Sequence, residues 1–131
     1  MTILTREQIL QANDIITETL LVPEWGGEVR VRGLSGAERD KFESSTVELH
    51  GKRRELNLAN VRARLVSLSL VDENGKRIFS DADIHVLGRK SAAALDRVFS
   101  AAQRLSGLTD EDVEELAKNS NGGQSEDSGS D

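Results

Sequence analysis

The feature of this sequence that most constrains its fold is a set of four helix-start signals. Each places Ser or Thr three residues before Glu, Asp or Gln, so that each side chain can bond the backbone N–H of the other residue in a first helical turn. Apolar residues flank three of them at the positions of a hydrophobic staple. The signals predict helices over about 6–12, 35–49, 81–88 and 109–118. The four signals are Thr5–Gln8, Ser35–Glu38, Ser80–Asp83 and Thr109–Asp112.

Two more helices are predicted from apolar stripes at helical spacing. Asn57 is a good cap for the first, over about 57–71, and Ser91 can cap the second, over about 91–106. Gly107 fits the end of the second helix. The first stripe consists of Leu58, Val61, Leu65 and Leu68. The second consists of Leu95, Val98, Phe99, Ala102 and Leu105.

The end of the first of these helices has two interpretations. The segment 66–71 alternates apolar residues with serines, as a half-buried strand does, and Asn74–Gly75 is typical of a hairpin turn. The helical stripe is longer than the alternating run, so we favour a helix to about Val71 that is followed by a turn. A small β-arm over 70–79 stays open as the alternative.

An antiparallel hairpin is predicted over about 15–33. Residues 15–22 are rich in β-branched and aliphatic residues, residues 23–27 form a turn signal with Pro and two Gly, and residues 28–32 alternate charged and apolar side chains. Val29 and Val31 are expected to face the core. The residues expected to face water or a partner are Glu28, Arg30 and Arg32.

Charge is concentrated at one end of the chain. Residues 109–131 hold eight acidic residues and one basic residue, for a net charge of −7, whereas residues 1–108 carry +1. Residues 119–131 offer nothing that can enter a core, so this segment cannot offset the entropy of ordering it. The predicted fold class is α+β, mainly α: an N-terminal antiparallel β-hairpin packs on a bundle of about four to five helices in one domain over 1–118, and a disordered acidic tail follows.

Residues that carry out catalysis or bind metals are scarce. Cysteine is absent, and the two histidines, His50 and His85, have no acidic residues at zinc-like spacing. We therefore expect no enzyme activity, no cofactor and no metal site. No signal-peptide pattern is seen at the N-terminus, and the longest apolar stretch, 65–71, is far shorter than the roughly 20 residues that cross a bilayer.

Nucleic acid is not an expected partner either. The body is almost neutral, whereas nucleic-acid-binding surfaces are strongly basic. Lys52–Arg54 with Arg62 and Arg64 form a single basic cluster, which lacks aromatic residues for base stacking. A solvated surface explains this cluster best, and a small DNA-binding regulator is the least favoured alternative.

Two surfaces are candidates for binding another protein. Trp25 either folds back onto the body from its hairpin loop or serves as an exposed anchor, since Trp is enriched at binding hot spots. The charged side chains of Arg30 and Arg32 lie on the same hairpin. Val113 and Leu116 lie on the last helix, which either completes the core or docks on a partner.

The chain resembles the tail assembly chaperones of long-tailed bacteriophages, of siphovirus or myovirus type, in particular those of actinobacterial phages and prophages. The resemblance lies in three stretches and in their order: a hairpin with a Trp-Gly-Gly loop, a helical body and a polar tail. The three stretches are residues 22–40, 79–83 and 108–113.

This resemblance implies that the chain binds the tape measure protein, keeps it soluble and helps tail tube subunits polymerise around it. It also implies a location in the host bacterial cytoplasm and absence from the mature virion. The tail tube protein and a C-terminally extended form of the chain, made by programmed frameshifting, are further implied partners. A structural tail component, such as a completion or connector subunit, is the alternative that the same lack of catalytic groups allows.

Overall fold

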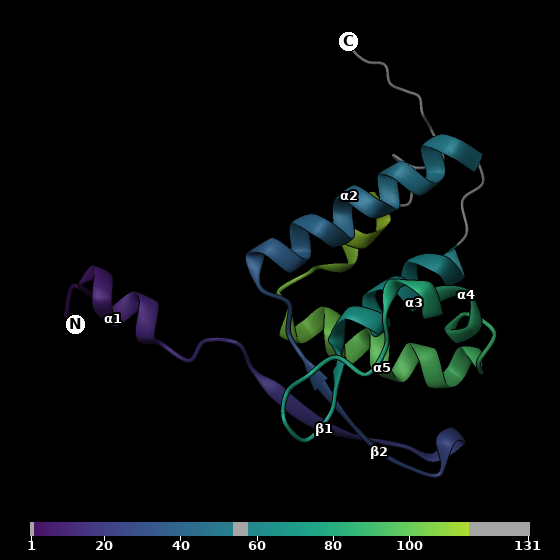
Figure 1. Ribbon diagram of the computed structural model, residues 1–131, viewed down its shortest axis with the longest axis horizontal. Helices are drawn as coiled ribbons and strands as arrows, with labels where there is room; N and C mark the ends of the chain where they lie inside the picture. Colours follow the sequence, from purple (N-terminus) through teal and green to yellow (C-terminus); the bar gives the residue numbers. More distant parts are fainter. Residues whose placement is uncertain (1, 54–57, 116–131) are drawn as a thin grey trace.

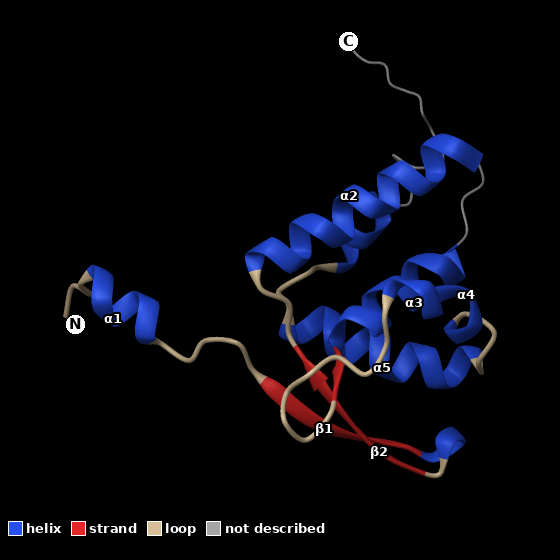
Figure 2. Ribbon diagram, in the orientation of Figure 1, coloured by secondary structure: helices blue, strands red, loops and turns tan. Residues whose placement is uncertain are grey.

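The computed structural model describes residues 2–53 and 58–115 (Figure 1). It confirms the predicted α+β class: a three-stranded antiparallel sheet lies against one side of a helical body (Figure 2). Residues 110–115 form a last helical segment, and the predicted tail lies outside the described residues. The other elements are α1 (Arg6–Gln11), β1 (Thr17–Val22), the 3-10 turn η1 (Pro23–Trp25), β2 (Gly27–Arg32), α2 (Gly36–Arg53), α3 (Leu58–Ser69), β3 (Leu70–Val71), the 3-10 turn η2 (Asp81–Asp83), α4 (Ile84–Leu87) and α5 (Ala92–Leu105).

All four predicted helix-start signals are formed as capping boxes. In each, the backbone N–H of the Ser or Thr donates to the side chain three residues later, at 2.8–2.9 Å. The reciprocal bonds to the Ser or Thr hydroxyl are also present. Ser91 caps α5 as predicted, because its hydroxyl accepts from the Ala94 N–H at 3.2 Å. Local sequence therefore determines where these helices begin.

The hairpin is confirmed, and its strands run over 17–22 and 27–32. The register pairs Thr17 with Arg32 and Val22 with Gly27. Gly26 lies between the strands with φ of 75°, a left-handed conformation that favours glycine. The side chain of Val31 is fully buried, as expected, and that of Val29 is half-buried.

The predicted helix end at Val71 was wrong, and the β-arm interpretation holds for residues 70–77. α3 ends at Ser69, and β3 pairs antiparallel with β2, with Val31 opposite Leu70. A further bridge joins Val71 to Arg77 across the turn. The free edge of β2 offers Leu70 and Val71 backbone partners that their own sequence does not reveal, so tertiary context decides between helix and strand.

Two other helix boundaries differ from the prediction. Residues 50–53, expected to be a polar connection, are the last turn of α2. Lys and Arg are good helix formers, and the single Gly51 costs only about 1 kcal/mol, which does not end a helix. The helix predicted over 81–88 is shorter and begins as η2 before it continues as α4.

The core is built around α3. From Leu65 to Ser69 every side chain of this helix is at most 3% exposed, including the two serines. The Ser67 hydroxyl donates to the Arg64 carbonyl oxygen at 2.9 Å, so this buried group is satisfied within the helix. The body adds fully buried side chains from β1, β2, α2 and α5: Val22, Val31, Phe42, Ala94, Val98 and Ala102.

In the part of the chain that the structure describes, no helix has both the length and the apolar character needed to span a bilayer.

Gly33 brings the hairpin close to α5, and we predict that Gly33→Ala destabilises the protein. A Cβ at Gly33 would lie 2.5 Å from the carbonyl oxygen of Leu105, which is backbone and cannot rotate away. We expect the free energy of unfolding to fall by about 1–3 kcal/mol, measured by urea denaturation. Gly36→Ala is the control, because no atom lies within 4 Å of its Cβ position. Equal stability of the two variants would contradict close packing at Gly33.

Candidate partner-binding groove

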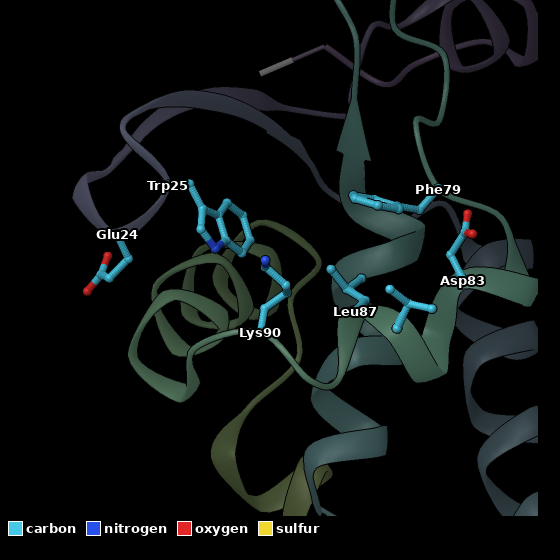
Figure 3. Close-up of a pocket in the computed structure, with 7 residues that line it drawn as sticks. Glu24, Trp25, Phe79, Asp83, Leu87 and Lys90 are labelled. Atoms are coloured by element: carbon cyan, nitrogen blue, oxygen red, sulfur yellow. The ribbon is translucent and has the colours of Figure 1, made fainter.

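A groove of about 540 Å³ lies between the tip of the hairpin and the segment that contains η2 and α4 (Figure 3). Its walls are mainly apolar, which is typical of sites that bind another molecule. Charged side chains stand at its rim. The apolar walls come from Trp25, Phe79, Val86 and Leu87, and the rim from Glu24, Asp83 and Lys90.

The hairpin tip is held in place by α5. Pro23 begins η1 directly after β1, with a backbone already set for a helical turn. The Glu24 carboxylate then accepts from Arg97 Nε at 3.0 and 3.2 Å. This hydrogen bond is the main reason why the pKa of Glu24 lies below its ordinary value. The wall that carries Trp25 is thereby attached to the body.

Trp25 lies between the two roles considered for it. Its half-buried ring packs against the core, as expected of a side chain that folds back, and the same ring lines the groove. The indole Nε1–H is buried and has no hydrogen-bond acceptor among the described residues. A buried donor without an acceptor costs about 1–3 kcal/mol, so packing of the ring must offset that cost.

The opposite wall is positioned by a predicted capping box. Ser80 and Asp83 bond reciprocally and start η2, with Phe79 directly before it. α4 then turns the side chain of Leu87 inward, where it is 3% exposed, while Val86 stays 63% exposed at the groove. Val86 can therefore be changed without disturbing the core.

The two hairpin arginines have different environments. The side chain of Arg30 is exposed on β2. Arg32 is half-buried and forms an ion pair with Glu38 at the start of α2. Glu38 also accepts from the Ser35 N–H at 2.9 Å. Arg32 thus joins the sheet to α2, which leaves Arg30 as the arginine that a partner can reach.

The last helical segment packs against the body. Val113 is only 8% exposed and belongs to the core cluster, and Leu108 is 4% exposed. Asp112 lies 3.6 Å from the Arg39 guanidinium. Of the two roles considered for Val113, the structure supports completion of the core. Leu116, the other candidate on this segment, lies outside the described residues.

The groove brings together residues that sequence reasoning did not connect. Phe79 lies in one of the three stretches that carry the family resemblance, and neither Val86 nor Leu87 was predicted as a site residue. They come from a segment more than fifty residues after Trp25, so no local pattern could indicate that they meet. The apolar side chains of Ile9 and Leu10 on α1 are exposed as well, and the sequence did not predict a surface there.

Groups that suit metal binding do not gather in the described residues. No cluster of three or more His, Asp or Glu side chains there has the geometry to hold an ion. His85 is exposed on α4. The basic residue Arg62 forms an ion pair with Asp96 at 2.8 Å.

The chain is similar to a known protein family over most of its length. The family described as phage tail assembly chaperone matches residues 5–119. None of the curated proteins and none of the solved structures matches the chain.

The ion pair between Arg32 and Glu38 predicts pH-dependent stability. Burial alone would raise the pKa of Glu38, but the Ser35 N–H and the Arg32 guanidinium outweigh it and hold the pKa below its ordinary value. A lowered pKa stabilises the fold above the unfolded pKa of about 4.3, and this contribution is lost as pH falls through the folded pKa. We expect Glu38→Gln to lose about 1–3 kcal/mol in urea denaturation at pH 7.

The loss should shrink as pH is lowered from 7 through the folded pKa of Glu38, because the native carboxylate then takes up a proton and loses its charge as well. Glu43→Gln is the matched control, because its ion pair with Arg39 is more exposed and such pairs contribute about 0–1 kcal/mol. A Glu38→Gln loss that is the same at both pH values would show that the charge of Glu38 is not responsible.

Proposed function

The chain belongs to the phage tail assembly chaperone family, and we propose that it acts in tail assembly by binding the tape measure protein in the groove beside Trp25. The groove is the observation that carries the proposal. It presents apolar walls from two segments far apart in the chain, fixed to the body by the Glu24–Arg97 hydrogen bonds and the Ser80–Asp83 capping box.

The client segment that fits this groove is an amphipathic helix. A short apolar groove with charges at its rim accepts the apolar face of a helix, and polar residues of the helix meet the rim. Asp83 and Lys90 provide both signs at that rim. Covering apolar client helices in this way would prevent them from aggregating, which requires no catalytic group and agrees with the non-enzymatic role of a chaperone.

The acidic end of the chain adds to this role. Residues 109–131 carry a net charge of −7, and charge far from zero keeps a complex soluble through repulsion between its copies. We further propose that the chain acts in the host bacterial cytoplasm, and that the tail tube protein and a frameshift-extended form of the chain join the same assembly.

Val86→Asp tests the groove directly. It places a charge on an apolar wall at a side chain that is 63% exposed, so the fold should be retained. We expect the soluble fraction of the tape measure protein from the same genome to fall several-fold when it is co-expressed with this variant, because the carboxylate must lose its water when the client binds.

Ile78→Asp is the matched control, since Ile78 is 48% exposed and lies outside the groove. It should support the client as well as the native chain does. Equal loss in both variants, or none in either, would place the client elsewhere. A tape measure protein whose solubility does not depend on the native chain at all would remove the basis for the proposed function.

Release of the client gives a second prediction. A chaperone leaves when the tail tube has formed, so peptides of this chain should be absent from mass spectra of purified virions. The same spectra should contain the tail tube and tape measure proteins, which serve as the positive control. Peptides of this chain at the level of a virion subunit would favour the structural tail component instead.

A further inference from the structure

The N-terminal arm, residues 3–16, carries large apolar side chains that the rest of the described chain leaves uncovered. Figure 1 shows α1 standing apart from the body at the end of a linker, and none of its residues is buried. Exposed apolar side chains that occur together mark an interaction site. Ile15 is half-buried, and the other large apolar side chains of the arm are at least 56% exposed: Ile3, Leu4, Ile9, Leu10 and Ile16.

The arm leads into a strand edge that is open. The strand order is β1-β2-β3, so β1 is an edge of the sheet in the described part of the chain. Its sequence, TETLLV, contains neither Lys nor Pro, which protect edges from pairing with another chain, and its one charged residue, Glu18, is paired with Arg104 on α5. Leu21 on this strand is 60% exposed. The edge is therefore suited to adding a strand.

The direction of the free backbone groups follows from the hairpin register. The Gly33 N–H donates to the Ile16 carbonyl at 3.0 Å, so every second residue from Ile16 onward bonds to β2. The residues between them direct their N–H and C=O groups outward from the sheet. These outward residues are Thr17, Thr19 and Leu21.

We propose that two copies of the chain pair antiparallel through β1, and that each copy lays its N-terminal arm in the groove of the other. If the pair is centred on Thr19 of both copies, Thr17 of one copy lies opposite Leu21 of the other. The outward N–H and C=O groups of each copy then face those of its partner. The arm of one copy then emerges beside the hairpin tip of the other, where Trp25 lines the groove. Such an interface is symmetric and closed.

The geometry favours a second copy over the same chain as the occupant. The groove lies at the far end of β1 from the arm, and a six-residue strand spans about 20 Å. The Gly33 N–H bond to the Ile16 carbonyl holds the start of β1 in the sheet, so within one chain the linker of residues 12–15 would have to reverse direction and run back along the strand before α1 could reach the groove. In the antiparallel pair no reversal is needed.

The area and charge of the surfaces agree with this arrangement. If each of the five arm side chains buries roughly 100 Å², the two arms alone cover about 1,000 Å², the lower limit for a specific interface. Arg6 and Glu7 on α1 bring both signs of charge to a rim that holds Asp83 and Lys90. The arm would then shield the groove until a client displaces it, and only this last step rests on the proposed function.

Leu10→Asp tests the arm. The variant should fold as the native chain does, because α1 buries no residue. The full native chain should sediment as a dimer, and the variant should dissociate at a concentration at least about tenfold higher. Trp25 is the only tryptophan of the chain, so its quenching by acrylamide reports groove coverage directly. Quenching should increase in Leu10→Asp and stay unchanged in Asn13→Asp, which adds the same charge to the linker.

Thr19→Pro tests the strand edge, since it removes an outward N–H and leaves the β2 ladder intact. It should also weaken the dimer, whereas Thr19→Val should not. A native chain that is monomeric at all concentrations overturns the proposal, and so does a dimer unaffected by Leu10→Asp. Arm-dependent shielding of Trp25 in a monomer also overturns it, because it shows docking within one chain. The tape measure protein is absent from these measurements. Their results therefore do not depend on whether the proposed client binds.

Discussion

The burial of α3 is the constraint on which the rest of the structure depends. Its last five residues are at most 3% exposed, so other elements must cover it on every side. α2, α4 and α5 cover the helix, and the sheet closes the core through Val22 and Val31. In this buried stretch serines alternate with apolar residues, which is why its sequence resembles a strand. Ser67 is tolerated there because its hydroxyl bonds to the Arg64 carbonyl.

The orientation of the hairpin on this core creates the groove. Arg104 on α5 pairs with Glu18 of β1 at 2.8 Å, and Arg97, two turns earlier on the same helix, holds Glu24 at the hairpin tip. Each pair is exposed and contributes little to stability. Together they join the start and the tip of the hairpin to α5. Trp25 is thereby kept opposite Phe79, and an apolar surface stays open beside a well-packed core.

An incompletely covered apolar surface suits a chaperone of tail assembly. A monomer that covered all its apolar side chains would have nothing to offer an aggregating client. Here the groove and the N-terminal arm are both left exposed within one chain, at opposite ends of β1. In the proposed pairing of two copies, the strand edge brings the arm of one copy to the groove of the other.

The sequence by itself determined where the helices begin, where the hairpin lies and which face of its second strand is buried. It also determined the charged C-terminal segment. Capping boxes, turn glycines and charge act over a few residues, so a local pattern is enough to predict them. It also carried the resemblance to the family through the Trp-Gly-Gly loop and the helix-start segments. Only the tertiary structure decided that Leu70 and Val71 leave α3 for the sheet, that Arg32 turns to Glu38, that Val113 is buried, and that Trp25 meets Phe79 and Val86. Each of these depends on segments distant in the chain, whose contacts are set by how the helices and strands cover α3 and not by any local pattern.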